Sequence, residues 1–453
     1  MKPRRSPLFA GIGHRPLRTL VIGLMIASQS AAQTSRTIPP SPAGVIEFTE
    51  AELKRILRHS PLPDPPADPT NRWADHPGAV ELGRLLFFEP RLSATGDTSC
   101  ATCHDPAKSF TDGRALSQGA GPGLRNTMSL WNVAYNRWYF WDGRSDTLWS
   151  QALQPIERDI ELNGSRTRLA RLLFTDEGLR RAYESVFGDP PDVSDPARFP
   201  EEARPAAAGV EDAGHRAWSG MSESDREQVN QVFVNAGKAI AAFERRLLSR
   251  RAPFDVFVEG LREGDPVKAS ALSESAQRGL KFFMGEGNCF FCHAGPNFTD
   301  NEFHNIRVPP LDPARPPDSG RFHGAEQVLR DPFNALGPYS DERSGAAADK
   351  IEFLANSPEN WGRVKTPSLR NVATTAPYMH QGQFADLDAV LRYYSTLEGA
   401  VTFGHHDREN IIRPLNLTPE QMADLRAFLE SLTDTELPPD LLDGAAREPP
   451  GRE

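Results

Sequence analysis

Apolar residues return at helical spacing in several separate stretches of this chain. The longest stretch runs from Glu223 to Arg250, where apolar residues recur every three or four positions. They are Val229, Val232, Phe233, Ala236, Ile240, Phe243 and Leu247. This spacing predicts a long helix with one buried face. Shorter stretches of the same kind predict helices at 50–58, 79–88, 273–283 and 419–432.

No comparable series of alternating apolar and polar residues predicts β-strands, so the expected fold class is mostly α. Stretches rich in proline and glycine divide the helices into groups. We therefore predict an N-terminal arm at 33–75, a first helical domain at 76–250 and a second at 251–436. Long loops are expected inside both domains, as a surface insertion at 189–222 and a loop region at 305–360.

The two ends of the chain differ from the domains. Basic residues precede a short apolar run at 20–27, and three small residues follow it at 30–32. This layout is typical of a cleavable signal peptide, here 1–32. An uncleaved membrane anchor is the alternative, although the run is shorter than the roughly 18 apolar residues of a membrane helix. We expect no membrane span in the mature chain and a frayed tail at 437–453.

The chain is acidic, with 61 acidic and 51 basic residues and a formal net charge of −10. Five of the basic residues and none of the acidic ones lie in 1–32, so its removal changes the net charge from −10 to −15. Such a surface repels nucleic acid and favours cationic partners. With 38% hydrophobic and 25% charged residues, the composition is that of a soluble globular protein.

The four cysteines of the chain fall into two identical motifs, 100–104 and 289–293, each of the form Cys-x-x-Cys-His. This motif is the attachment signature of c-type haem. The two thiols bond to the vinyl groups of the porphyrin, and the adjacent histidine becomes the proximal ligand of the iron. The sequence thus predicts two covalent haems. One is held by Cys100, Cys103 and His104, and the other by Cys289, Cys292 and His293.

Three other uses of paired cysteines fit less well. Disulfides are common in exported proteins, but they require no histidine after each pair. A shared zinc site usually has its two pairs separated by tens of residues, whereas nearly two hundred separate them here. A thioredoxin-like redox pair needs a βαβ context, which neither motif has.

With two haem motifs in these places, the chain resembles the bacterial di-haem cytochrome c peroxidase and MauG superfamily over roughly 75–435. The resemblance rests on an ordered series of segments. They are 100–104, 124–126 (Leu-Arg-Asn), 140–144 (Phe-Trp-Asp-Gly-Arg), 151–157 with Glu161, 289–293, 365–371 and 376–380. It implies two weakly duplicated, cytochrome c-like domains in the periplasm. In that family the N-terminal haem is high-spin and reacts with hydrogen peroxide, while the C-terminal haem is six-coordinate and stores or passes electrons.

The resemblance also implies roles for residues near the first haem. Glu161 matches the acid/base over the iron, since O–O cleavage requires a proton to be removed and one to be delivered. Gln151 would be its polar neighbour, and Pro155 would close the distal face sterically. The alternative is that Glu161 is an ordinary surface carboxylate beside Glu157 and Asp159.

Trp141 matches the residue that lies between the two haems in the family and carries electrons or holes. Residues 131–149 hold four of the seven tryptophans, and most of these aromatics are better explained as packing around a large flat cofactor. Asn126, Thr375 and Pro377 match the family's inter-haem calcium site. Backbone carbonyl ligands leave no side-chain signature, so the sequence by itself says little about this site.

The sixth ligand of the second haem is methionine in ordinary members of the family and tyrosine in MauG. Here the matching position is Tyr394, on a helix whose inward stripe is predicted to contain Leu387, Val390, Leu391 and Tyr394. A core tyrosine hydrogen-bonded to a propionate is the alternative. Phenolate is a hard anionic donor that favours Fe(III) and higher states. Tyrosine here therefore favours high-valent chemistry over electron storage.

Two further departures from the family pattern affect the functional hypothesis. Many di-haem peroxidases carry a histidine that caps the resting first iron, but no histidine lies between His104 and His215. The first haem is therefore expected to be open without reductive activation. MauG has a surface tryptophan two residues before its second motif, where this chain has Gly287. The protein substrate of MauG therefore does not transfer.

The leading hypothesis is a periplasmic di-haem oxidoreductase that reduces hydrogen peroxide at the first haem and shares oxidising equivalents with the second. The stored equivalents would oxidise a small redox protein, cytochrome c or cupredoxin, or aromatic side chains of a protein substrate. A purely electron-carrying di-haem cytochrome is one rival, and it predicts two low-spin irons that do not react with peroxide. A redox sensor with negligible turnover is the other.

Overall fold

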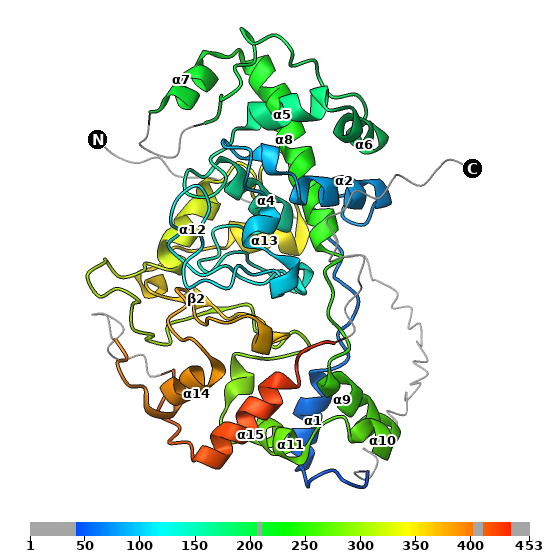
Figure 1. Ribbon diagram of the computed structural model, residues 1–453, viewed down its shortest axis with the longest axis vertical. Coiled ribbons are helices and arrows are strands. Elements are labelled where there is room, and N and C mark those ends of the chain that lie inside the picture. Colours follow the sequence, from blue (N-terminus) through cyan, green and yellow to red (C-terminus); the bar gives the residue numbers. More distant parts are fainter. Residues whose placement is uncertain (1–41, 206–210, 402–410, 436–453) are drawn as a thin grey trace, which may run out of the picture. The chain divides into compact units, whose positions relative to one another are not determined.

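The computed structural model of the chain describes residues 42–205, 211–401 and 411–435 (Figure 1). The predicted signal peptide, 1–32, and the predicted tail, 437–453, lie outside the described residues. Helices dominate what is described, and the β structure consists of β1 (Phe303–His304) paired antiparallel with β2 (Val364–Lys365). The predicted fold class, mostly α with long loops and little β, is confirmed. Within the described ranges, none of the helices combines the length and apolar character that a bilayer crossing requires.

The first half of the chain contains eight α-helices in the described residues. They are α1 (Glu50–Arg58), α2 (Pro77–Phe87), α3 (Cys100–Cys103), α4 (Leu148–Glu157), α5 (Arg166–Thr175), α6 (Glu177–Phe187), α7 (Ala213–Gly220) and α8 (Glu223–Glu244). Short 3-10 helices lie at Pro90–Leu92, Pro106–Lys108 and Val133–Tyr135.

The second half contains seven α-helices in the described residues. They are α9 (Pro253–Glu263), α10 (Pro266–Ala269), α11 (Glu274–Met284), α12 (Arg321–Arg330), α13 (Gly345–Glu352), α14 (Leu387–Thr396) and α15 (Pro419–Glu430). Short 3-10 helices lie at Cys289–Phe291, Pro358–Asn360 and Val372–Thr374.

Each half is built around one close helix crossing, of α2 with α8 and of α11 with α15. A glycine stands at each crossing. A Cβ on Gly83 would lie 1.9 Å from the carbonyl oxygen of Ala239, and a Cβ on Gly279 would lie 2.0 Å from that of Asp424. No other residue allows two helix backbones to approach so closely. The helix before each haem motif is thereby fixed to the last long helix of its own half.

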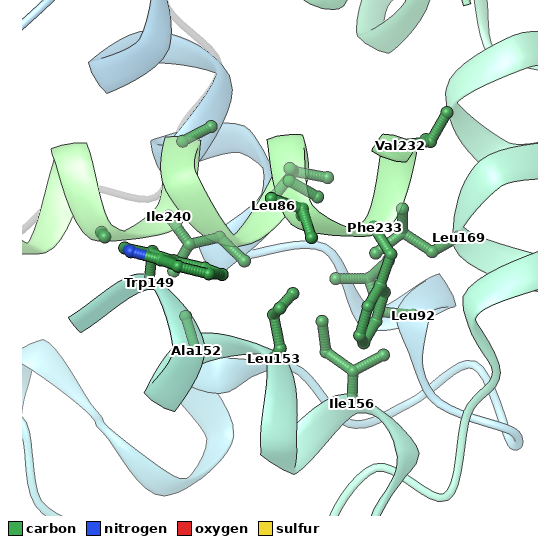
Figure 2. Close-up of a cluster of buried hydrophobic side chains, with 14 of the residues drawn as sticks. Leu86, Leu92, Trp149, Ala152, Leu153, Ile156, Leu169, Val232, Phe233 and Ile240 are labelled. Atoms are coloured by element: carbon green, nitrogen blue, oxygen red, sulfur yellow. The ribbon is translucent and has the colours of Figure 1, made fainter. Parts of the chain in front are cut away.

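The first core lies between α4 and α8 (Figure 2). Trp149, Leu153 and Ile156 of α4 face Phe233 and Ile240 of α8, and all five side chains are buried. Burial of five such side chains contributes on the order of 10 kcal/mol before the opposing entropy terms. One face of α4 is thus fixed in the core, and its other face is left for the site.

A second core fills the C-terminal half. Its centre is a set of phenylalanine rings in edge-on and tilted contact, from Phe254, Phe283, Phe298 and Phe428. Phe298 is fully buried and follows the second haem motif by a few residues. The ring cluster therefore supports the loop that carries His293.

The arm segment binds both halves. Its helix α1 lies beside α9 and α11 (Figure 1), and Arg55 donates to the carbonyl oxygen of Met284 over 2.6 Å. Further along the arm, Pro63 accepts a hydrogen bond from the Tyr135 hydroxyl, and Thr70 accepts one from the Trp149 indole. The described part of the arm is thus a strap across the two halves.

The described parts of the long loop regions are more buried than the sequence pattern suggested. In 189–222 the side chains of Val193, Phe199 and Trp218 belong to the first core. The region 305–360 contains α12 and α13, which the pattern did not predict. Both helices are short and half-exposed, so their apolar residues make only brief stripes.

Candidate functional site

The two motif histidines are held in the same way. The Nδ1 of His104 lies 3.0 Å from the carbonyl oxygen of Phe110, and the Nδ1 of His293 lies 3.0 Å from that of Phe298. Burial lowers the pKa of both imidazoles, so both are neutral. A neutral imidazole that donates through Nδ1 presents the lone pair of Nε2, which is the arrangement of a metal-ligating histidine.

None of the four motif cysteines forms a disulfide. Cys100 and Cys103 lie on the one-turn helix α3, while Cys289 begins the 3-10 helix before Cys292. Helical spacing puts both thiols of each motif beside their histidine. The two cysteines and the histidine of each motif fit a c-type haem. The two motifs are too far apart to share one zinc ion.

Three residues predicted for the distal side of the first haem lie on α4 and the loop after it. Gln151 and Pro155 are four residues apart and share the face of α4 that does not enter the core. The Oε1 of Gln151 is buried and has no hydrogen-bond partner among the described residues. Pro155 accepts the backbone hydrogen bond of Leu162, which holds the loop carrying Glu161 against the end of the helix.

Glu161 differs from the carboxylates beside it. Glu157 is bound to Arg166 at 2.7 Å, and Asp159 is exposed. The side chain of Glu161 is only 26% exposed, and its charge acts on the pKa of Cys100, Cys103 and His104. Its backbone carbonyl accepts from Ala120 over 2.7 Å. The geometry therefore groups Glu161 with the first haem motif.

Trp141 lies where the two halves of the chain meet. Its carbonyl oxygen accepts a hydrogen bond from the backbone N–H of Lys365 over 2.8 Å. In the same way, the carbonyl oxygen of His380 accepts one from the backbone N–H of Asn126 over 2.8 Å. The rings of Trp141 and His380 pack edge-on, with centroids 6.4 Å apart. The Trp141 indole also donates to the Asn126 carbonyl over 2.9 Å. Trp141 is thus fixed in place from both halves.

These hydrogen bonds reveal a duplication. Trp141 and His380 each stand inside a tight turn that an isolated β-bridge closes, Tyr139 with Ser145 in one half and Tyr378 with Phe384 in the other. The residue before each has a positive φ, 64° at Phe140 and 72° at Met379. Each turn accepts a backbone hydrogen bond from a segment of the other half, Trp141 from Lys365 and His380 from Asn126, so Trp141 and His380 are counterparts across the junction.

Tyr394 lies on α14, close enough to Cys289 and Cys292 for electrostatic interaction. Burial raises the pKa of Tyr394, and its hydroxyl makes no hydrogen bond to the described residues. Of the inward stripe predicted for α14, Leu387 and Leu391 are buried, whereas Val390 and Tyr394 are half-buried. Tyr393, which the predicted stripe left out, is buried, and Ile306 accepts a hydrogen bond from its hydroxyl over 2.6 Å. Of the two tyrosines, Tyr394 is the one whose hydroxyl can bind a further group.

Of the three residues of the predicted calcium site, Asn126 contacts the segment that follows the other two but contacts neither of them directly. Asn126 contacts the 376–380 segment through His380, and its Nδ2 donates to the Arg114 carbonyl over 2.7 Å. The hydroxyl of Thr375 donates to Val372 over 3.1 Å. No described contact joins Asn126 to Thr375 or Pro377, so the calcium site stays a prediction.

A buried charge network lies beside Glu161 and was not predicted from the sequence. Asp142 accepts from both Arg125, at 2.5 Å, and Arg144, at 3.2 Å, and Arg125 also binds Asp318. These guanidinium groups hold the pKa of Asp142 far below its usual range against the effect of burial. The family resemblance could have indicated this network, because its segments 124–126 and 140–144 contain Arg125, Asp142 and Arg144.

A second missed residue is His304, beside Cys292. Its Nε2 lies 2.7 Å from Asp300, and this hydrogen bond raises the pKa of His304. The pair is held at the edge of the second motif. Because Cys292 is expected to be bonded to haem, the three residues do not form a free metal site.

Comparison with known proteins agrees with this geometry. A family model described as di-haem cytochrome c peroxidase matches residues 77–263. The cytochrome-c peroxidase IdrP1 of Denitromonas iodatirespirans is 33% identical over 387 residues, which cover 83% of this chain and 86% of the relative. The chain belongs to the di-haem cytochrome c peroxidase family. It is therefore an oxidoreductase of the peroxidase type, and the predicted family and enzyme class are confirmed.

Other relatives of this di-haem peroxidase extend the likeness. The methylamine utilization protein MauG of Methylorubrum extorquens is 31% identical over 388 residues, which cover 84% of each chain. The solved structure of the diheme peroxidase BthA from Burkholderia thailandensis is 26% identical, with a TM-score of 0.58, and covers 82% of this chain and 91% of its own. Family membership implies haem cofactors, with peroxide and a redox protein as partners.

Proposed function

We propose that this di-haem peroxidase works in the periplasm, holds both haems covalently and reduces hydrogen peroxide at the first of them. Cys100, Cys103 and His104 would hold the first haem, and Cys289, Cys292 and His293 the second. Tyr394 would be the sixth ligand of the second iron. When bound, the two haems supply the electrons that, with two protons, convert hydrogen peroxide to two water molecules.

One observation carries the proposal: the helix that approaches the first motif bears Pro155 where the corresponding helix near the second motif bears Tyr394. The side chain of proline has no atom that can ligate iron, so Pro155 would close that side of the site sterically and leave the iron free for peroxide. Tyrosine has a phenol oxygen that serves as a ligand. The two sites are thereby suited to different tasks.

The protein's own groups then handle protons. A carboxylate oxygen of Glu161 takes a proton from one oxygen of hydrogen peroxide and returns a proton to the other oxygen as the O–O bond breaks. The electron pair of that bond goes to the leaving oxygen, which departs as the first water. The oxygen left behind would take the two electrons supplied by the haems and two protons, and leave as the second water. Gln151, with its unpartnered Oε1, orients the peroxide O–H.

Trp141, fixed between the halves, provides the route by which oxidising equivalents are shared. Their final acceptor is either a small redox protein, cytochrome c or cupredoxin, or an aromatic side chain of a protein substrate. A phenolate at the second iron favours the second fate, because it stabilises the oxidised state against easy reduction.

The variant Glu161→Gln tests the proposal. It should slow the peroxide reaction of the haem-loaded protein by about 10²- to 10⁴-fold, the usual contribution of a general acid–base group. The optical spectrum should stay unchanged. Asp159→Asn is the matched control, because Asp159 is exposed in the same loop. A wild-type protein that does not react with peroxide would instead indicate an electron-carrying cytochrome or a sensor.

A further inference from the structure

A guanidinium group faces Glu161 from inside the protein. Arg144 follows the turn that holds Trp141, and its side chain is only 9% exposed. Its Nη2 lies 4.0 Å from the Oε1 of Glu161. That distance is too long for a direct hydrogen bond but short enough for the two charges to attract each other.

The rest of the Arg144 side chain is held rigidly. Its Nη1 donates to both oxygens of Asp142, at 3.2 and 3.3 Å, and its Nε donates to Gln154 over 3.1 Å. The ring of Phe140 lies 3.4 Å from the guanidinium carbon. These contacts occupy every part of the guanidinium except Nη2, for which Glu161 is the charged neighbour in the described residues.

The support for Arg144 extends into the C-terminal half. Asp142 is shared with Arg125, and Asp318 binds Arg125 through two hydrogen bonds of 2.7 Å. Arg321 of α12 donates to the carbonyl oxygen of Gly143 over 2.6 Å. The region 305–360 therefore clamps the turn that carries Arg144, which gives this part of the chain a task near the first haem.

The other cation near Glu161 is less constrained. The Nε of Arg158 lies 3.4 Å from Glu161, but its side chain is 34% exposed and water screens its charge. A buried, pre-oriented cation has the stronger effect on a nearby carboxylate, since the local dielectric constant is lower.

We propose that Arg144 is a positioning residue of the peroxide site and acts through Glu161. Its Nη2 attracts the Glu161 carboxylate and directs it at the space where peroxide binds, so that the carboxylate can accept the peroxide proton. This inference rests on the proposed function of Glu161.

The test is a double-mutant cycle in the haem-loaded protein, with Arg144→Gln, Glu161→Gln and the combined variant. Two rates are measured: the reaction with hydrogen peroxide, and the binding of hydrogen cyanide followed by the haem spectrum. Cyanide loses a proton on binding, so its rate reports on Glu161 without turnover. Arg144→Gln should slow both rates by about tenfold or more. In the Glu161→Gln background it should add less than about twofold.

Matched variants separate charge from folding. Arg181→Gln removes an exposed guanidinium of the same half and should change neither rate. If Arg144→Gln fails to retain both haems, the same cycle is run with Arg144→Lys, which keeps the charge but not the contacts, and the same criterion applies.

Three results would overturn the proposal. An equal loss from Arg144→Gln in both backgrounds would indicate a purely structural role, with Glu161 still in place. A larger effect from Arg158→Gln would assign the task to Arg158. Unchanged rates in Glu161→Gln alone would remove the role of Glu161 and, with it, that of Arg144.

Discussion

Pro155 and Tyr394 occupy the same position on two corresponding helices. Thr147 caps α4 and Asp386 caps α14 through the same side-chain hydrogen bond, and Pro155 and Tyr394 each come eight residues after the cap. Both helices follow the tight turns that hold Trp141 and His380. Pro155 and Tyr394 are therefore equivalent positions of a duplicated scaffold. They differ in that the tyrosine side chain has an oxygen that can ligate iron and the proline side chain has none.

Replacing Tyr394 tests this asymmetry. In Tyr394→Phe the second iron should lose its sixth ligand and change from low-spin to high-spin, because phenylalanine has no donor atom. Electron paramagnetic resonance of the diferric protein measures the change. Tyr393→Phe is the control, since its hydroxyl is already bound to Ile306, and it should leave the signal unaltered. An unaltered signal in Tyr394→Phe would assign the ligand elsewhere.

Replacing Trp141 tests the sharing of oxidising equivalents. Trp141→Phe keeps a ring at the junction but loses the indole N–H that donates to Asn126. Binding of peroxide should be unchanged, while electron exchange between the haems should slow by about tenfold or more, because indole is the more easily oxidised ring. Freeze-quench spectroscopy of each haem follows the exchange. Trp361→Phe, in the half-buried aromatic cluster beside Phe322, serves as the control and should exchange at the wild-type rate.

The glycine at the second helix crossing is a test of the fold. Gly279→Ala places a Cβ about 2.0 Å from the Asp424 carbonyl oxygen, so α11 and α15 must separate. The free energy of unfolding should fall by about 1–3 kcal/mol, as for other overpacked sites. Gly220→Ala on α7 meets open space and should leave stability unchanged or raise it slightly. Urea denaturation of both variants makes the comparison. Equal stabilities would mean that the crossing is looser than described.

A buried carboxyl group predicts a pH dependence of stability. Glu244 is 4% exposed, and one of its oxygens has no partner among the described residues. Burial raises the pKa of Glu244 to about 8 from an ordinary value of 4.5. Between these pH values the folded state keeps a proton that the unfolded state has lost, so this group's contribution to stability is present below pH 4.5 and is lost as the pH rises to 8.

Glu244→Gln should remove that dependence. Its free energy of unfolding should exceed that of the wild type by about 1–3 kcal/mol at pH 8 and match it near pH 4.5. Urea denaturation at the two pH values gives the comparison. The exposed carboxylate of Glu177 offers a control in Glu177→Gln, which should show no such difference. A variant less stable than the wild type at pH 8 would show that the Glu244 carboxylate is stabilised by its surroundings.

Much of the fold followed from local patterns. The helix expected at 50–58 is α1, and those expected at 273–283 and 419–432 correspond to α11 and α15 within two residues. The long helix ends earlier than expected, at Glu244. Beyond it, Leu247 stays buried, but its carbonyl accepts from the backbone of Asn132 and the chain turns away to make that contact.

The rest depends on contacts between distant residues, which periodicity does not encode. The clamp of Asp318 and Arg321 on the Arg144 turn joins segments nearly two hundred residues apart. The crossing glycines were visible in the sequence, but nothing local showed which helix each one meets. Candidate residues such as Glu161 came from the family resemblance, and the structure adds the neighbours that distinguish Glu161 from Asp159.

The central claim is that the iron of the first haem is open to peroxide, whereas Tyr394 is the sixth ligand of the second iron. Electron paramagnetic resonance and optical spectra of the diferric protein, before and after one equivalent of hydrogen peroxide without reductant, test it most directly. We predict one high-spin and one low-spin haem, with prompt conversion by peroxide to a long-lived oxidised state. No reaction until one haem is reduced would contradict the account and indicate a reductively activated peroxidase.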